Sequence, residues 1–192
     1  MKIHSIAIAF VLSFSIISCK EISKSVEKSS KENSANVSKD IKTEEVTYNI
    51  NGQNYKSFVA YNETLSSKSP VVMVIPEWWG LNDYAKSRAK QLAELGYFAM
   101  AVDYYGEGKV VDNPGDAEKL ASPFYQIPVN SKTVFDGAKA QLLKFPNADI
   151  KKIAVIGYCF GGAQALNMAR QEGDLKGAVS FHGNLMTGVK PK

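Results

Sequence analysis

The fold is decided by residues 151–162, Lys-Lys-Ile-Ala-Val-Ile-Gly-Tyr-Cys-Phe-Gly-Gly. Two lysines lead into a short apolar run rich in β-branched residues, which ends in the motif Gly-x-Cys-x-Gly-Gly. The residues that follow, Ala163 to Arg170, read as a helix. The stretch therefore predicts a strand, a sharp turn and a helix in succession, which is the local structure of a nucleophile elbow.

The glycines of this motif have a steric reason. A strand that turns into a helix over one residue strains the backbone of that residue and crowds the residues two positions before and after it. Cys159 would then lie above the sheet at the N-terminus of a helix, whose dipole favours a thiolate. We interpret Cys159 as a candidate catalytic nucleophile. The alternative is a small apolar core residue, because Gly-x-Cys-x-Gly alone is a weak signal.

The N-terminus has the features of an export signal. Residues 1–18 contain Lys2 and then an apolar run, Ile6 to Ile17, that is too short to span a bilayer and fits a signal peptide. The residues Ile-Ile-Ser-Cys at 16–19 resemble the lipobox of bacterial lipoproteins, in which the cysteine is acylated. We therefore expect an exported, membrane-anchored bacterial lipoprotein on the periplasmic or cell-surface side, with the lipid on Cys19. An ordinary signal peptide is the alternative.

Residues 19–43 are predicted to be a disordered lipoprotein tether. This segment is rich in Ser, Lys, Glu and Asn and contains too few apolar residues to offset the entropy of ordering. Acids and bases alternate in it and the whole chain has a net charge of +4, so no nucleic-acid partner is expected. The chain has two cysteines, and with Cys19 assigned to lipid, Cys159 has no partner for an internal disulfide.

Residues 44–192 are predicted to form an α/β domain. Asn51-Gly52 is a hairpin turn signal, and the apolar runs after it alternate with segments of helical spacing. This order predicts a mostly parallel sheet with an N-terminal antiparallel hairpin. The expected strands are 46–50, 55–60, 70–76, 98–102, 153–156 and 177–181. The expected helices are 83–95, 131–144 and 163–170, with one short helix at 116–120 inside an irregular stretch, 107–128.

Three segments should meet at the carboxyl edge of this sheet, where α/β folds bind ligands: residues 76–80, 103–105 and the elbow. Acyl transfer needs N–H donors for the developing oxyanion, and in this architecture they come from the residue after the nucleophile and from the loop after an earlier strand. These are the backbone N–H groups of Phe160 and Trp78. Glu77, at the tip of the same strand, is either a carboxylate within reach of the thiol or a surface residue, and both interpretations stay open. The pocket residues expected around the thiol are Trp79, Tyr105 and His182.

Residues 76–82, 103–106, 157–162 and 179–183 together resemble the dienelactone hydrolase (carboxymethylenebutenolidase-like) family, over roughly Tyr48 to Asn184. The resemblance implies a three-layer α/β-hydrolase fold and hydrolysis of small carboxylic esters or lactones through a cysteine acyl-enzyme, with no metal or organic cofactor. It also implies a role for each matching residue: Cys159 as nucleophile, Trp78 and Phe160 as oxyanion hole, and Glu77 as the carboxylate that holds and helps to activate the thiol. The family's typical substrate-binding arginine has no clear match, and Arg88 is not given that role.

A general base is not recognisable after Cys159. In this fold the chain order is nucleophile, acid, histidine, but only Glu172, Asp174 and His182 are available. The two carboxylates should lie at the edge of the sheet away from the site, and His182 comes too early, so we interpret it as a pocket-lining residue. We expect a hydrolase that is incomplete at the C-terminus and impaired in activity, with an apolar sheet edge at Gly177 to Phe181.

Two other functions remain open. The first is a non-catalytic, membrane-anchored binding lipoprotein with a degenerate hydrolase fold. The second, a thiol redox protein, is disfavoured because the chain lacks a Cys-x-x-Cys pair. The sequence leaves the substrate and the oligomeric state undetermined.

Overall fold

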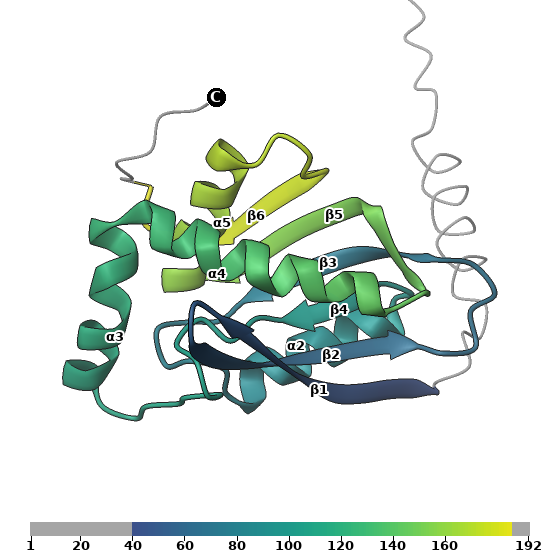
Figure 1. Cartoon of the computed structure of the whole chain (residues 1–192), viewed down its shortest axis with the longest axis horizontal. Coiled ribbons are helices and arrows are strands. Elements are labelled where there is room, and N and C mark those ends of the chain that lie inside the picture. Colours follow the sequence, from purple (N-terminus) through teal and green to yellow (C-terminus); the bar gives the residue numbers. More distant parts are fainter. Residues whose placement is uncertain (1–39, 186–192) are drawn as a thin grey trace, which may run out of the picture. The chain divides into compact units, whose positions relative to one another are not determined.

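The computed structural model describes residues 40–185 (Figure 1). The predicted signal segment, the lipidation residue Cys19 and the predicted tether up to residue 39 lie outside the described residues. Among residues 40–185, no helix is both long enough and apolar enough to cross a bilayer.

The strands of the described part form one mixed sheet. They are β1 (Ile41–Ile50), β2 (Gln53–Asn62), β3 (Ser69–Ile75), β4 (Phe98–Ala101), β5 (Ala148–Tyr158) and β6 (Gly177–Phe181). Their order in the sheet is β1-β2-β4-β3-β5-β6. The pairs β1–β2 and β2–β4 are antiparallel, and β3–β4, β3–β5 and β5–β6 are parallel. The predicted parallel sheet with an N-terminal hairpin is confirmed.

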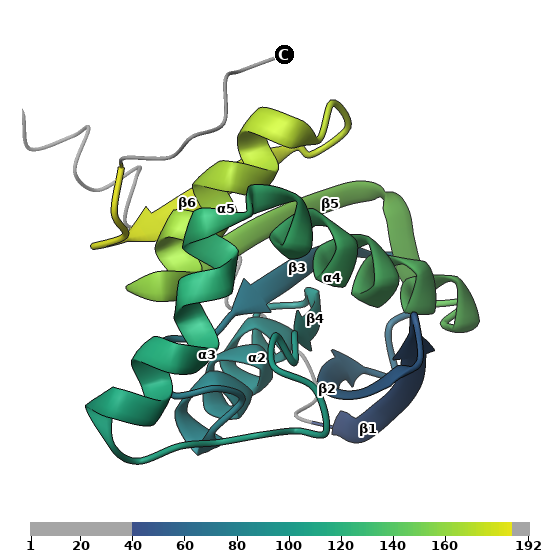
Figure 2. The ribbon, with the colours of Figure 1, turned by 60° about the vertical axis from the view of Figure 1, so that its left-hand side comes forward.

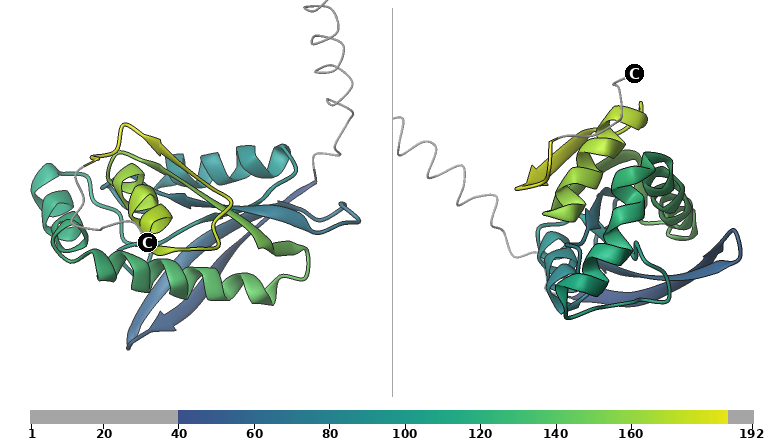
Figure 3. Two further views of the ribbon diagram at one scale, coloured as in Figure 1. Left: turned by 90° about the horizontal axis from the view of Figure 1, so that it is seen from above. Right: turned by 90° about the vertical axis from the view of Figure 1, so that its left-hand side faces the viewer.

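Helices lie on both faces of this sheet, which gives three layers (Figures 2 and 3). One face is covered by α2, and the opposite face by α4 and α5. The helices are α2 (Asp83–Glu94), α3 (Pro114–Gln126), α4 (Pro128–Gln141) with the 3-10 turn η1 (Leu142–Lys144) after it, and α5 (Phe160–Gln171). Along the chain, β3, β4 and β5 are each connected to the next strand through helices, as the alternating sequence pattern predicts.

The strand β3 separates the two cores. Met73 and Ile75 pack on the side of α4 and α5, whereas Val74 packs on the side of α2. A strand that is buried on both faces needs apolar residues at every position, which explains the continuous apolar run. On the α2 side the helix presents small residues to the sheet: Ala85, Ala89 and Ala93.

The prediction for residues 107–128 is wrong in one respect. The structure has a helix of 13 residues, α3, where the sequence predicted a short helix at 116–120. Pro114 occupies the first turn, where it costs no hydrogen bond, and the Asn113 side chain accepts from the N–H of Asp116. The Pro and Gly content of the stretch concealed a helix whose buried residues have helical spacing: Ala117, Ala121 and Phe124.

The boundary of the predicted tether also needs correction. β1 begins at Ile41, so residues 41–43 belong to the sheet and not to the tether. Ile41 pairs with Asn62 and packs against the α2 core, which extends the hairpin by several residues. At its other end the hairpin turns at Asn51 and Gly52, with φ of 52° and 89°, as the turn signal predicts.

Candidate active site

Cys159 occupies the turn between β5 and α5. Its φ of 52° and ψ of −113° lie in a region that side-chain-bearing residues rarely adopt. Its N–H donates to the carbonyl oxygen of Phe181 at 2.9 Å, and its own carbonyl accepts from the N–H of Ala163 at 3.2 Å. Cys159 is partly exposed, so it is not sealed in the core. The predicted strand–turn–helix geometry is therefore present.

Gly157 and Gly161 are required by close backbone packing. A Cβ at Gly157 would lie 2.0 Å from the carbonyl oxygen of Gly161. A Cβ at Gly161 would lie 2.2 Å from the carbonyl oxygen of Ile75. A side chain at either position would push the backbone segments apart, so these glycines let α5 begin directly against the carboxyl end of β3.

The loop after β3 is tied to the segment after β4. The hydroxyl of Tyr105 donates to the carbonyl oxygen of Trp78 at 3.0 Å. The segment after β4 is itself fixed by the buried Asp103 carboxylate, which accepts backbone N–H groups from Lys56, Tyr105, Gly106 and Gly108. The three segments predicted to converge on the carboxyl edge of the sheet are thus brought together.

Two backbone donors at this edge have no partner. The N–H groups of Trp78 and Phe160 donate to no acceptor among residues 40–185. Phe160 is the first residue of α5, where an N–H has no acceptor within the helix. Unpaired donors of this kind are what an oxyanion hole requires.

Phe160 is the centre of an aromatic cluster, which we define as Phe160 and the four rings around it. The ring centroids lie 5.6–5.9 Å from that of Phe160 for Tyr104, Tyr105, Phe124 and Tyr125. Phe160 is buried, but Tyr125 keeps 41% of its surface exposed. Phe124 and Tyr125 come from α3, and sequence reasoning missed them because it placed most of that helix in an irregular stretch.

The thiol of Cys159 acts electrostatically on two tyrosines of this cluster. Burial raises the pKa of both Tyr105 and Tyr125 above the ordinary value of 10.0, and negative charge on Cys159 raises each further. No lysine or arginine of the described part contributes to either pKa. Both hydroxyls are therefore protonated at neutral pH, and that of Tyr105 donates its proton to the carbonyl oxygen of Trp78.

Glu77 precedes Trp78 in the loop after β3. Its partly buried carboxylate has no hydrogen bond or ion pair within residues 40–185, including none to Cys159. Its charge acts on Tyr158, which packs on the α2 side of the sheet. Burial raises the pKa of Tyr158 most, Arg88 opposes the increase and Glu77 adds to it.

The remaining predicted pocket residues differ in their surroundings. Trp79 is partly buried, with its ring centroid 5.1 Å from that of Trp78. His182 follows β6 with a φ of 46°, and its side chain is exposed. It is the one histidine of the described part, and it has no hydrogen bond there. Residues 40–185 contain no cluster of three or more His, Cys, Asp or Glu side chains suited to a metal ion.

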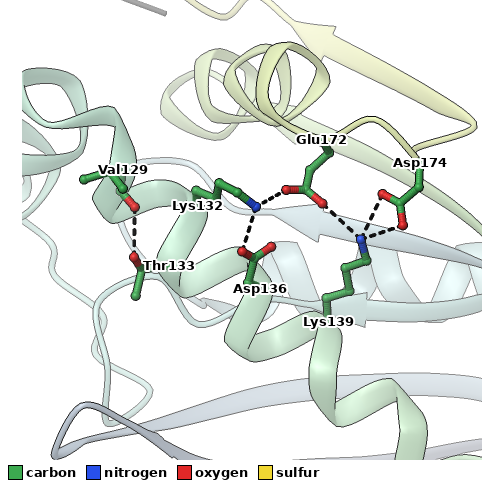
Figure 4. A network of polar contacts seen from close by, with 7 residues as sticks. All are labelled: Val129, Lys132, Thr133, Asp136, Lys139, Glu172 and Asp174. Carbon is green, nitrogen blue, oxygen red and sulfur yellow. Dashed lines mark hydrogen bonds and ion pairs between the residues drawn. The ribbon is translucent and has the colours of Figure 1, made fainter. Parts of the chain in front are cut away.

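Glu172 and Asp174 lie before β6, at the edge of the sheet away from Cys159, as predicted. They form an ion network with α4 (Figure 4). Lys139 binds Glu172 at 3.0 Å and Asp174 at 2.9 Å. Lys132 binds Asp136 at 2.7 Å and also pairs with Glu172. These carboxylates therefore connect α4 to the end of α5, and neither is placed to assist the thiol.

The chain matches the model of one protein family. The model of the dienelactone hydrolase family matches residues 56–192. Protein usf of Aquifex pyrophilus is 34% identical over 143 residues, which cover 72% of this chain and 60% of that protein. The chain thus spans about three fifths of that relative.

Solved structures agree in fold. The structure m3DLH superposes with a TM-score of 0.73 at 33% identity, over 77% of this chain and 61% of that one. A dienelactone hydrolase-like promiscuous phosphotriesterase from metagenomic libraries superposes with a TM-score of 0.72 at 34% identity, over 76% of this chain and 61% of that one. The elbow and the helices α2 to α5 lie within residues 56–192, which the family model matches.

Proposed function

Because the chain belongs to the dienelactone hydrolase family, we propose that it hydrolyses small carboxylic esters or lactones through an acyl-enzyme on Cys159. One observation carries this proposal. Cys159 is partly exposed on a left-handed turn at the start of α5, and the N–H groups of Phe160, the next residue, and of Trp78, in the loop after β3, have no acceptor among residues 40–185.

Each group has a distinct proposed role. The sulfur of Cys159 attacks the carbonyl carbon, forming a C–S bond, and the ester C–O bond breaks as the alcohol leaves with a proton. The N-terminal end of α5 favours the thiolate through its dipole. The N–H groups of Trp78 and Phe160 stabilise the oxyanion, and each such donor typically lowers the barrier by about 3 kcal/mol. Water then hydrolyses the thioester.

Glu77 is proposed as the carboxylate that holds and helps to activate the thiol. Two observations support this role. The residue immediately precedes Trp78 in the loop, and its partly buried charge is not neutralised by an ion pair within the described part.

We expect acylation to be faster than deacylation. His182 is exposed and makes no hydrogen bond to Cys159, so residues 40–185 position no imidazole to activate water. Losing one member of a catalytic triad lowers kcat by about 10⁴ to 10⁶-fold. An ester substrate should therefore give a burst of product equal to the thiol concentration, followed by slow turnover.

The test is the burst of p-nitrophenolate from p-nitrophenyl acetate. We expect the burst in the natural chain, its loss in Cys159→Ala, and a rate about 10-fold lower with unchanged amplitude in Glu77→Gln. Equal release of p-nitrophenolate by the natural chain and Cys159→Ala would contradict the proposal. If Glu77→Gln keeps the full burst rate, only the proposed role of Glu77 is contradicted.

We also propose that the protein is a lipoprotein held at a bacterial membrane through Cys19, on the periplasmic or cell-surface side. The apolar run followed by Ile-Ile-Ser-Cys at 16–19 supports this. Incorporation of labelled palmitate in a bacterial host is the test. Cys19→Ser should abolish the label, whereas Cys159→Ser, the matched control at the other cysteine, should keep it.

A further inference from the structure

We propose that a cavity between the β1–β2 hairpin and the helices α3 and α4 binds an uncharged pyranose sugar, and that the Tyr55 hydroxyl donates a hydrogen bond to it. The cavity encloses about 330 Å³ between residues 50–55 of the hairpin and residues 124–134 of the two helices, and we call it the hairpin cavity. None of these residues belongs to the proposed acylation site, so the inference does not depend on the proposed hydrolase function.

The hairpin cavity lies at the edge of the sheet where ligands bind in this class of fold. Because β1 and β4 both pair antiparallel with β2, β1 runs in the same direction as β4. The hairpin turn therefore lies at the same edge as the carboxyl end of β4, and α/β folds bind ligands at that edge. Phe124 lines the cavity and also contacts Phe160, with ring centroids 5.7 Å apart.

The walls of the cavity are fixed by contacts within the described part. Ile50 packs directly on Gly137 of α4, where a Cβ would lie 2.3 Å from the end of the Ile50 side chain. The side-chain amide of Gln53 donates to the carbonyl oxygen of Tyr105 at 2.8 Å. A site whose walls are already held in place loses little conformational entropy when a ligand binds.

Tyr55 supplies an unpaired donor. Only 6% of this residue is exposed, and its ring stacks on that of Tyr48 with centroids 5.7 Å apart. The Tyr48 hydroxyl is bonded to Ser57 at 2.7 Å, whereas the Tyr55 hydroxyl has no hydrogen bond within residues 40–185. Its oxygen is not sealed from solvent, and the side chain lines the hairpin cavity, so the hydroxyl opens into it. A buried side chain with an unpaired polar atom calls for a partner.

Acceptors lie around this donor. The side-chain amides of Gln53 and Asn130 use their N–H groups on backbone carbonyls, which leaves their own carbonyl oxygens without a partner in the described part. The Thr133 hydroxyl donates to a backbone carbonyl at 3.0 Å and keeps its lone pairs. Every hydroxyl of a sugar both donates and accepts, so a sugar can use the Tyr55 donor and these acceptors together.

Apolar residues complete the lining. Ile50, Phe124 and Val134 offer apolar surface for the C–H groups of a sugar ring, while every polar side chain of the lining is an uncharged amide or hydroxyl. Ligand pockets combine apolar walls with a few placed polar groups, and they span about 300–1,000 Å³. The hairpin cavity lies at the small end of that range, which suits a single ring.

The experiment is a titration of the natural 192-residue chain, isotopically labelled, with methyl glycosides of glucose, galactose, mannose and N-acetylglucosamine. We expect at least one of them to shift the side-chain amide NMR signals of Gln53 and Asn130 with a Kd of about 1 mM, as for a ligand of this size with ordinary contacts. Tetrahydropyran-2-methanol has the same ring without the ring hydroxyls. It should bind at least about 10-fold more weakly than that glycoside.

Variants assign the binding to the hairpin cavity. Tyr55→Phe should raise the Kd about 10-fold by removing one hydrogen bond. Tyr48→Phe is the matched control on the ring stacked against it, and it should leave the Kd unchanged because the Tyr48 hydroxyl is bonded to Ser57. Thr133 is exposed on α4, so Thr133→Trp should fold, fill the cavity and abolish binding. Cys159→Ala should bind the sugar as tightly as the natural chain.

Four results would overturn the proposal. None of the glycosides shifts the Gln53 and Asn130 signals at about 50 times the expected Kd, or tetrahydropyran-2-methanol binds equally well. Tyr48→Phe weakens binding as much as Tyr55→Phe, or the folded Thr133→Trp variant still binds. Weaker binding in Cys159→Ala would also contradict it, because the sugar would then lie at the thiol. The ester burst is measured separately, so none of these results changes the test of the proposed function.

Discussion

The backbone of Cys159 is held in a conformation that costs free energy. A residue with a side chain at such angles is strained by about 1–3 kcal/mol, and it persists only where its surroundings impose it. Here the surroundings are the hydrogen bonds to Phe181 and Ala163 and the close approach of Gly157 to Gly161. This strained backbone conformation places the sulfur outside the core and at the first turn of α5.

This strain can be measured by comparing two variants that both lack the thiol. We expect Cys159→Gly to unfold with a free energy about 1 kcal/mol higher than Cys159→Ala, because glycine adopts positive φ without a Cβ clash. Urea unfolding followed by circular dichroism gives the difference. Equal stabilities, or a more stable alanine variant, would mean that the turn is not strained at this residue.

The side chains at the site were predictable where backbone geometry dictates them. Gly157, Cys159 and Gly161 follow from the steric demands of the elbow. Tyr125 does not, because its contact with Phe160 depends on how α3 returns over the sheet, which no local pattern specifies. The position of Glu77 just after β3 could be predicted, but the direction of its side chain depends on the packing of the loop after β3.

At the level of elements, the ion network holds α4 against the end of α5 (Figure 4). Glu172 is its centre, because its side chain is only 8% exposed and pairs with both Lys132 and Lys139. We expect Glu172→Gln to lower the free energy of unfolding by about 2 kcal/mol, since two charge-assisted hydrogen bonds are lost. Asp174→Asn is the matched control. That side chain is 64% exposed, so its loss should cost less than about 1 kcal/mol.

The same network predicts how stability depends on pH. Although burial opposes it, hydrogen bonds from Lys132 and Lys139 lower the pKa of Glu172 below its ordinary 4.5. Its contribution is therefore complete above pH 4.5 and is lost as the pH falls through the lowered pKa. The pKa values of both lysines are raised above 10.5, so their contributions are complete below that pH and are lost above it. Melting temperatures of the natural chain and Glu172→Gln should converge in acid, and a constant difference down to pH 2 would contradict this.

The start of α2 depends on a single cap. The Asn82 side chain accepts from the N–H of Ala85 at 3.1 Å, directly after the loop that carries Trp78. Asn82→Ala should lower the free energy of unfolding by about 1 kcal/mol, and Asn82→Ser should restore most of it because serine also caps helices. If chemical denaturation gives Asn82→Ala and Asn82→Ser the same free energy of unfolding, the cap does not contribute to stability.

The elements were predictable in proportion to the strength of their periodicity. The buried strands β3, β4 and β5 and the hairpin turn carry strong local signals, and all are present. α3 was underestimated because Pro114 and Pro123 lie inside it, and tertiary contacts of Phe124 outweigh the local cost of Pro123. The first residues of β1 were assigned to the tether, because their strand is stabilised by pairing with β2 and not by their own composition.

At the level of the whole molecule, both tryptophans of the chain lie in one loop, after β3. This loop is connected to the rest of the fold through the Tyr105–Trp78 hydrogen bond and the bridge between Gly80 and Val110. Tryptophan fluorescence and far-ultraviolet circular dichroism should therefore report the same urea midpoint, as in two-state unfolding. An earlier fluorescence transition would show that the loop opens before the sheet.

The hydrogen bond from the N–H of Cys159 to the carbonyl of Phe181 has a further consequence. β6 lies at the end of the sheet order and is paired only with β5 in the described part, so it is the strand most exposed to fraying. Each time β6 frays, the amide of the nucleophile loses its acceptor. The rate of deuterium exchange at the Cys159 amide should therefore report how often β6 opens. The rate at which the sulfur reacts should change in parallel with it.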